Sequence, residues 1–245
     1  MDEIKRHFED EAREFDDIIA KLIPYYDSRM VEALVAALPF DPAAQIRVLD
    51  LGCGTGTVAQ AILDRFPKAH ITCLDFAENM IAMARGKLAH HSHVRYIVGD
   101  FKTFEFDGPY EAVVSSLALH HLVTNEDKRC LYRRIFECLT LGGVFYNADV
   151  VLGSSDFLQA MYIRQWRAFM RHYVTEEEID RKWIPKYDAE DRPAKLLDQL
   201  AWLTEIGFVQ VDAICKFYNF AVYGGAKRDP AWSLAGRPPP RNKIQ

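Results

Sequence analysis

The sequence predicts an α/β fold built on a mostly parallel sheet with helices on both of its faces. Three observations predict it. Short apolar runs alternate with helical patterns from about residue 46 to residue 151, as expected for parallel strands joined by crossover helices. A glycine-rich turn, Gly52-Cys-Gly-Thr-Gly56, joins the first strand directly to a helix. An aspartate also stands at or beside the end of each of the first three strands: Asp50, Asp75 and Asp100.

Two helices are expected before the sheet. Residues 3–22 place apolar side chains at helical spacing among charged ones, which predicts an amphipathic helix that packs on the main domain or covers a ligand. The chain breaks at Pro24, and Asp27 or Ser28 is expected to cap a second helix that runs to about Leu38. We interpret residues 1–45 as an N-terminal helical lid.

The main domain is expected over residues 46–226, with seven strands. Its first five strands are predicted at 46–51, 70–74, 94–98, 110–115 and 144–151. Helices are predicted between them at 56–66, 77–88 and 126–139, the last one stopping at Leu141-Gly142-Gly143.

The alternation stops after strand five. Residues 154–192 are helical in pattern and rich in aromatic side chains and arginine, which predicts an inserted helical cap, followed by a core helix at 193–206. Strands at 209–215 and 217–223 complete the sheet, the last one antiparallel to its neighbours. The polar, proline-rich stretch 227–245 predicts a disordered tail.

The composition suits one α/β domain with additions: 245 residues, 49% of them hydrophobic. A net charge of −5 disfavours nucleic acid as a partner. The five cysteines show no C-x-x-C spacing, so we expect neither a disulfide framework nor a cysteine metal site. No apolar run reaches the roughly 18 residues of a membrane span, and the charged N-terminus lacks a signal-peptide core. A cytoplasmic protein without membrane contact is expected, and a homodimer is left open.

The glycine turn differs from two common nucleotide loops. No Gly-Lys-Ser/Thr follows it, so it is not a P-loop. Thr57 stands where the third glycine of G-x-G-x-x-G would fall. The helix N-terminus could still bind a pyrophosphate. However, Asp50 just before the turn would repel a phosphate, whereas it could hold a cation such as an α-amino group.

Residues 50–56, Asp-Leu-Gly-Cys-Gly-Thr-Gly, resemble the first motif of the class I S-adenosylmethionine (SAM)-dependent methyltransferases, in the methyltransferase-domain superfamily. The resemblance implies a Rossmann-like fold, SAM as the cofactor, and methyl transfer to a small-molecule substrate. It implies that Asp50, Gly52 and Gly54 form the turn of the cofactor site and that Asp75 accepts hydrogen bonds from ribose hydroxyls.

The resemblance further places Asp100 against the adenine amino group, with Phe76, Met80 and Phe101 beside the ring. Each acid taken singly could be only a helix cap or a turn former. NAD is the rival cofactor, since it shares the ribose acid, but it would not favour Asp50 before the turn. Three acids at the same sheet edge, beside a glycine turn, favour the SAM hypothesis.

His120 and His121 follow strand four, where the methyl group of bound SAM would lie. Either one could act as a catalytic general base, because histidine titrates near neutral pH. Alternatively, the pair only shapes the pocket wall. We expect no metal site, on the argument that adjacent residues diverge and that no H-x-E or C-x-x-C partner accompanies them.

The segment from Phe15 to Tyr26 is also similar to the N-terminus of carboxy-SAM synthase, the enzyme that feeds tRNA wobble-uridine modification. This similarity implies that Tyr26 contacts the cofactor. Ser116 stands where that family has an asparagine near the cofactor. The arginine expected to hold the extra carboxylate would fall near Arg181 or Lys182. Ordinary methyl transfer is therefore the preferred hypothesis, and a carboxy-SAM synthase-like enzyme linked to tRNA modification is the alternative, with a SAM-binding protein without turnover as a third.

The acceptor pocket is expected between the N-terminal lid and the cap. Candidate substrate residues are Tyr162, Arg171, Arg192 and Asn219. Arginines that face a cleft would suit a carboxylate or phosphate, whereas arginines on the outside of a cap are simply solvated. Methyl transfer needs mainly the alignment of nucleophile, methyl group and sulfur, so the sequence leaves the nucleophile (O, N, S or C) open.

Overall fold

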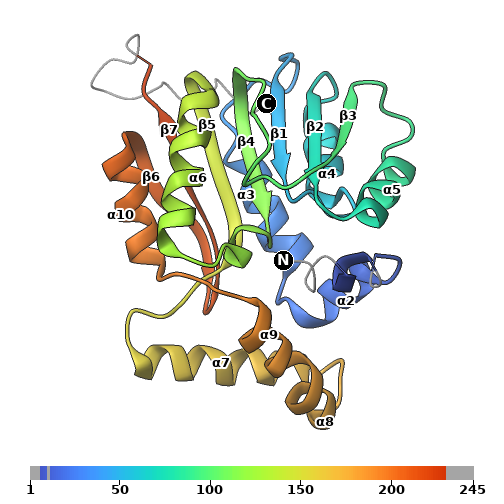
Figure 1. The fold of residues 1–245 in the computed structure, drawn as a ribbon, viewed down its shortest axis with the longest axis vertical. Coiled ribbons are helices and arrows are strands. Elements are labelled where there is room, and N and C mark those ends of the chain that lie inside the picture. Colours follow the sequence, from blue (N-terminus) through green and yellow to red (C-terminus); the bar gives the residue numbers. More distant parts are fainter. Residues whose placement is uncertain (1–5, 10–11, 230–245) are drawn as a thin grey trace, which may run out of the picture.

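A seven-stranded sheet forms the centre of the molecule in a computed structural model that describes residues 6–9 and 12–229 (Figure 1). The strand order is β3-β2-β1-β4-β5-β7-β6. The first five strands pair in parallel, and β7 is antiparallel to both β5 and β6. The strands are β1 (Arg47–Leu51), β2 (His70–Asp75), β3 (Val94–Val98), β4 (Tyr110–Ser116), β5 (Leu139–Val150), β6 (Phe208–Phe217) and β7 (Phe220–Lys227). The predicted fold class is confirmed.

Helices cover both faces because successive strand residues point to opposite sides. Along β1, Val48 joins one buried apolar cluster, and Leu49 joins the other. The first cluster contains side chains of α3 (Glu32–Ala36) and α4 (Thr57–Arg65), and the second contains side chains of α6 (Asn125–Cys138) and α10 (Leu196–Ile206). Helix α5 (Glu78–Lys87) connects β2 to β3. The parallel crossovers therefore bring the carboxyl ends of β1, β2 and β4 to one edge.

The N-terminal region differs from the predicted single helix over residues 3–22. Residues 6–9 are helical, residues 12–14 form a turn, and α2 spans Phe15–Leu22. The next helix begins at Tyr26, not after Asp27 or Ser28, because Tyr25 adopts a left-handed conformation with φ 56° and sets the helix start. It runs as a π-helix, η1 (Tyr26–Val31), directly into α3, and no side chain caps it.

The segment between β5 and α10 is helical, as expected. It comprises α7 (Asp156–Met170), α8 (Glu176–Glu178), a second π-helix η3 (Ile179–Trp183) and α9 (Ile184–Glu190). These helices lie below the carboxyl edge of the sheet, and α9 and α2 occupy that same side (Figure 1). A short 3-10 turn, η2 (Leu119–His121), follows β4 and faces them.

Two predicted boundaries near the end of the sheet are wrong. Residues 141–143 do not end a helix, because α6 stops at Cys138 and β5 begins at Leu139. The register shift between Tyr110 and Ala112 accommodates this early start. The last strand begins at Phe220, after a turn in which Tyr218 has φ 52°, and it extends to Lys227. Most of the predicted tail, residues 230–245, lies outside the described residues.

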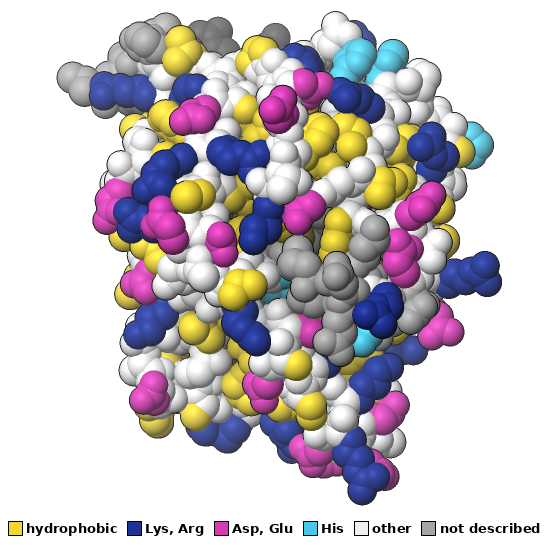
Figure 2. Space-filling model, viewed as in Figure 1, with side chains coloured by type: hydrophobic (Ala, Val, Ile, Leu, Met, Phe, Trp, Pro, Cys, Tyr) yellow, Lys and Arg dark blue, Asp and Glu magenta, His cyan; other side chains and the backbone are white. Residues whose placement is uncertain are grey.

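Charged side chains of both signs are interspersed on the face shown in Figure 2, and its described residues form no continuous basic surface. In the described part of the chain, we find no helix with the length and apolarity needed to cross a bilayer.

Two glycine-to-alanine substitutions should change stability in opposite directions. A Cβ at Gly224 would lie 1.9 Å from the backbone oxygen of Phe145, so Gly224→Ala must push β7 away from β5 and should cost roughly 3 kcal/mol. A Cβ at Gly86, in α5, would meet nothing within 4 Å. Gly86→Ala should therefore stabilise the protein by about 0.5 kcal/mol through helix propensity. Urea unfolding midpoints of the two variants measure both effects, and equal midpoints would contradict this packing.

Candidate functional site

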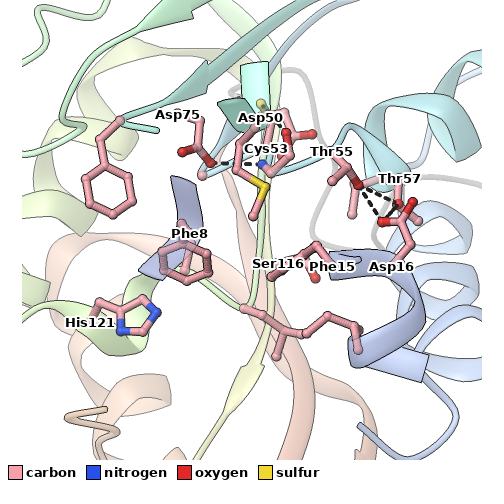
Figure 3. Close-up of a pocket in the computed structure, with 18 of the residues that line it drawn as sticks. Phe8, Phe15, Asp16, Asp50, Cys53, Thr55, Thr57, Asp75, Ser116 and His121 are labelled. Atoms are coloured by element: carbon pink, nitrogen blue, oxygen red, sulfur yellow. Dashed lines mark hydrogen bonds between the residues drawn. The ribbon is translucent and has the colours of Figure 1, made fainter. Parts of the chain in front are cut away.

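A cavity lies at the carboxyl edge of the sheet, beneath the N-terminal segment, residues 6–9 and 12–22 (Figure 3). We call it the cofactor cavity. All ten residues predicted to bind the cofactor line it: Tyr26, Asp50, Gly52, Gly54, Asp75, Phe76, Met80, Asp100, Phe101 and Ser116. Residues separated by up to 90 positions in the chain thus meet at one place, as the strand-end argument expects.

The glycine turn brings backbone groups to the cavity wall. Gly52, Gly54 and Gly56 have φ values of 68°, 53° and 86°, which other residues rarely adopt. A Cβ at Gly52 would also lie 2.3 Å from the Cβ of Ala118. The backbone N–H groups of Gly52 and Cys53 donate to the carbonyl of Leu74 at 2.8 and 3.1 Å, which holds the turn against the end of β2.

Asp50 is the most isolated polar group of the site. It is fully buried, and neither of its carboxyl oxygens has a hydrogen-bond partner of ordinary geometry in the described part of the chain. Burial, and then the nearby charge of Asp75, raise the pKa of Asp50 to about 7, opposed only weakly by the backbone N–H of Ala59. A cationic group bound here would compensate the buried charge.

Asp75 is buried but partnered. Its Oδ1 accepts from the backbone N–H of Ala77 and its Oδ2 from that of Gly54, both at 2.9 Å. Burial raises the pKa of Asp75 to about 6, although these N–H groups lower it. A carboxylate can accept about four hydrogen bonds, so Asp75 retains capacity for ligand hydroxyls. Asp100, by contrast, accepts from the backbone N–H of Lys102 at 2.8 Å.

The floor of the cavity joins the N-terminal region to β4. The hydroxyl groups of Tyr26 and Ser116 lie 3.0 Å apart, at hydrogen-bond distance. Burial, despite the bond to Ser116, raises the pKa of Tyr26 well above its usual value, so its phenol stays protonated. Both residues were predicted to contact the cofactor, and the structure brings them together from positions 90 residues apart.

The N-terminal segment closes the cavity with two aromatic rings that the sequence analysis did not single out. Phe8 contacts the rings of Phe15 and Phe76 edge-on, each at a centroid distance of 5.9 Å, and that of His121 at 5.5 Å. Figure 3 shows Phe8 between His121 and the turn that carries Cys53. Phe8 and Phe15 are seven residues apart, which is about two helical turns. This spacing could have predicted from the sequence that the two rings lie on one side of the N-terminal segment.

A polar cluster fastens this segment to the glycine turn. Asp16 of α2 accepts from the hydroxyl of Thr55 at 2.5 Å and from Lys87 Nζ at 2.7 Å. Lys87 also donates to Thr55 and Thr57 at 3.0 and 2.9 Å. Partial burial would raise the pKa of Asp16, but the bonds to Lys87 and Thr55 lower it below its usual value, so Asp16 is ionised.

A second set of hydrogen bonds attaches the N-terminal segment to the start of α5. The two carboxylate oxygens of Glu9 accept from the first backbone N–H groups of α5, those of Glu78 and Asn79, each at 2.7 Å. This is the position where a carboxylate best complements the helix dipole. The described N-terminal residues are thus bonded both to the glycine turn and to α5.

His120 and His121, both predicted as catalytic candidates, have opposite protonation. His120 is buried, with Nδ1 2.5 Å from Asp149 Oδ1 and Nε2 3.4 Å from Asp191 Oδ1. Burial would lower the pKa of His120, but the two carboxylates raise it to about 10, so this imidazole holds its proton. The structure therefore does not support His120 as a general base.

His121 lines the cofactor cavity. Burial, and then the positive charge of His120, lower the pKa of His121 to about 4. It is neutral at pH 7 and able to accept a proton. Of the two histidines, only His121 combines a neutral ring with a place on the wall of the cofactor cavity, and a pKa of about 4 makes it a weak base.

A second cavity adjoins the first. The two share wall residues Phe8, Phe15, Ile19, Leu117 and His121. On its other side the second cavity is lined by side chains of the cap, chiefly Trp166, Trp183 and Tyr187 with Lys186, Glu190 and Asp191. It therefore lies between the N-terminal segment and the cap, where an acceptor pocket was expected.

The four predicted substrate residues do not line either cavity. The Nζ of Lys216 lies over the Tyr162 ring, 4.1 Å from the ring centroid, and Arg171 forms an ion pair with Glu176. Arg192 donates to carbonyls at the end of α9, such as Asp191 O at 2.6 Å. Asn219 is buried in the β6–β7 turn. The residue types suited a substrate site, but the side chains contact other parts of the protein and not a cavity.

Comparisons with known proteins find a methyltransferase domain and relatives with two different printed activities. Residues 48–143 match the model of a methyltransferase domain. The chain is 32% identical over 196 residues to the malonyl-[acyl-carrier protein] O-methyltransferase of Bacillus anthracis, a match that covers 78% of this chain and 66%, just under two thirds, of that protein. It is 28% identical over 236 residues to the carboxy-S-adenosyl-L-methionine synthase of Wolinella succinogenes, covering 91% of this chain and 94% of that protein.

Solved structures share the fold. Human N-acetylserotonin methyltransferase in complex with SAM has a TM-score of 0.60 at 15% identity, covering 92% of this chain and 57% of that one. The SAM-dependent methyltransferase SibL in its apo form has a TM-score of 0.57 at 20% identity, covering 81% and 55%.

Asp50→Asn should reduce the pH dependence of stability in the ligand-free protein. A carboxyl whose pKa rises from 3.8 to about 7 on folding stabilises the folded state fully below its unfolded pKa, and this contribution is lost as the pH rises to 7. The wild type should therefore lose stability between about pH 5 and pH 7, by at most about 1.4 kcal/mol for each pH unit from this group. Asp75 adds a smaller loss in the same direction.

Thermal unfolding at a series of pH values measures this effect. The matched control is Asp64→Asn, the same change at an exposed position in α4, which should follow the wild-type curve. An Asp50→Asn curve parallel to the wild type would show that Asp50 is already ionised in the ligand-free protein.

Proposed function

From the match of residues 48–143 to a methyltransferase domain, we propose that the chain is a SAM-dependent methyltransferase, which binds SAM in the cofactor cavity and transfers a methyl group to a small molecule held in the second cavity. The observation that carries the proposal is the buried, unpartnered carboxyl of Asp50 at the end of β1. The α-amino group of SAM is a cation of suitable size for this position, and the nearby Asp75 retains acceptor capacity for ribose hydroxyls.

The remaining lining residues suit the other parts of the cofactor. Phe76, Met80 and Phe101 offer apolar surface to adenine, and the free acceptor capacity of Asp100 suits its amino group. When bound, SAM supplies an electrophilic methyl group on a positively charged sulfur. The Tyr26 hydroxyl, protonated and bonded to Ser116, is placed to orient the ligand at the cavity floor.

The chain then has three tasks. It aligns the acceptor with the methyl group, which in favourable cases lowers a barrier by roughly 7 kcal/mol. The rings of Phe8 and Phe15 exclude water from the shared wall. If the acceptor arrives protonated, neutral His121 is placed between the two cavities to receive that proton.

The second cavity defines the class of acceptor in general terms. Its walls are mainly apolar and aromatic, and three of its polar residues, His120, His121 and Asp191, lie together at what we call its polar end. A small molecule with an apolar body and one polar end fits this division. An oxygen nucleophile, as in the relative named malonyl-[acyl-carrier protein] O-methyltransferase, is one candidate.

A carboxy-SAM synthase-like enzyme, linked to tRNA modification, is the second candidate. It is favoured by a similarity that extends over 94% of the relative's length. It is disfavoured by charge, because the described residues that line the cofactor cavity include no lysine or arginine to pair with an extra carboxylate. Arg181 is exposed and paired with Glu177, and Lys182 lies over the ring of Trp183. Methyl transfer therefore remains the better proposal.

Asp50→Asn should weaken SAM binding at least tenfold, because the ammonium group loses a buried anionic partner. Isothermal titration of the purified chain with SAM measures this, with Asp64→Asn as the control that should bind normally. Mass spectrometry of small molecules released from the freshly purified protein completes the experiment. Release of carboxy-SAM would favour the second candidate, and release of NAD or unchanged affinity in Asp50→Asn would contradict the assignment of the site.

Asp16→Ala should speed the release of SAM several-fold, because it removes the ion pair with Lys87 and the bond to Thr55 that hold α2 over the glycine turn. Stopped-flow measurement of SAM dissociation tests this. The adjacent exposed residue provides the control, Asp17→Ala. If Asp16→Ala instead lowers the melting temperature equally with and without SAM, and leaves dissociation unchanged, the segment is a structural element and not a lid.

A further inference from the structure

Three potential ligand atoms converge at the polar end of the second cavity. They belong to His120, His121 and Asp191, each of which offers one ligand atom, and these atoms lie within 4.8 Å of one another. The histidines come from η2, after β4, and Asp191 directly follows α9. The sequence argument that adjacent histidines diverge does not hold here. Their ring centroids are 4.1 Å apart, and each ring has a nitrogen near the same carboxylate oxygen.

The separations approach those of a metal site. Asp191 Oδ1 lies 3.4 Å from His120 Nε2 and 3.6 Å from His121 Nδ1. Ligand atoms that bind Zn²⁺ tetrahedrally at 2.0–2.1 Å are about 3.3 Å from one another. Two imidazoles and one carboxylate are also a common ligand set for divalent transition metals that keep an open position. Small side-chain rotations would therefore close this group around an ion.

Asp149 supplies the support that metal-binding histidines usually have. It accepts a hydrogen bond from His120 Nδ1 at 2.5 Å, which directs Nε2 toward Asp191. Asp149 is itself fixed, because its Oδ2 accepts from the backbone N–H of His120 and from Asn147 Nδ2, both at 3.1 Å. A carboxylate that orients a histidine in this way is typical of metal sites. A purely structural ion pair between His120 and Asp149 would not explain why His121 and Asp191 also lie beside His120.

We propose that His120, His121 and Asp191 bind one divalent transition metal ion, such as Zn²⁺, with its open coordination position toward the second cavity. All three residues line that cavity, so an ion and a ligand could both reach them. In the framework of the proposed function, on which this consequence alone rests, the ion would bind the polar end of the acceptor and favour its deprotonated form. Because His120 is protonated without a metal, binding of the ion releases the Nε2 proton to solvent. Metal binding itself does not depend on methyl transfer.

Titration of the full chain, freed of metal with a chelator, with Co²⁺ tests the site. A Co²⁺ ion held by two imidazoles and a carboxylate gives a visible absorption band, and Zn²⁺ should abolish it by displacement. We expect one equivalent per chain. Asp191→Asn and His121→Gln should each weaken binding at least tenfold, and Asp149→Asn should weaken it by roughly 10- to 100-fold. The matched control is Asp188→Asn, an exposed aspartate of α9, which should bind Co²⁺ normally.

Two results would overturn the proposal. One is the absence of a Co²⁺ band in the folded wild type. The other is a band of equal affinity in Asp191→Asn and His121→Gln, which would place the ion on other histidines or on the free cysteines. Circular dichroism of each variant shows whether it is folded. SAM titration of the wild type separates the two proposals. SAM binding by a wild type that gives no Co²⁺ band rejects only the metal site, and a Co²⁺ band without SAM binding rejects only the proposed function.

Discussion

The carboxyl of Asp50, buried at the end of a central strand without a partner, is the constraint on which the rest of the site depends. An isolated charge in such a place is strongly unfavourable, and a second buried acid, Asp75, stands near it. Either a proton or a bound cation must neutralise Asp50. The sheet thus places an unfavourable group where a ligand can correct it, so the same residue that weakens the ligand-free protein near neutral pH strengthens binding.

The N-terminal segment determines how well Asp50 is shielded from water. Phe8 and Phe15 line the cavity from above, and Asp16 and Glu9 bond that segment to the glycine turn and to α5. If the segment moved away, water would solvate Asp50, and the burial that raises its pKa would weaken. Closure and cation binding are therefore linked thermodynamically, because each lowers the cost of the other. The rings of Phe8 and Phe15 also line the second cavity, so closure of the N-terminal segment completes the wall of that cavity as well.

The sequence was most informative where one local pattern determines both structure and chemistry. Strand β3 and the glycine turn follow from periodicity and from backbone conformations that favour glycine, and the shared sheet edge follows from parallel topology. All ten predicted cofactor residues consequently line one cavity. Prediction failed where the outcome depends on tertiary contacts. No local signal showed that α6 would pass directly into β5, or that Tyr25 would start a helix in a left-handed conformation. The faces that Tyr162 and Arg171 present are likewise set by how the cap packs.

The histidine pair shows why residue type alone cannot assign a role. Two adjacent imidazoles with the same ordinary pKa become different groups because Asp149 bonds to His120 alone, whereas Asp191 lies 3.4 Å from His120 and 3.6 Å from His121. The charge that these acids stabilise on His120 in turn disfavours a second charge on His121. His121 therefore presents an unprotonated nitrogen at the boundary between the two cavities. Such a nitrogen can accept a proton from a bound ligand or coordinate a metal ion. The carboxylates around His120 thus set the protonation of the neighbouring residue that lines both cavities.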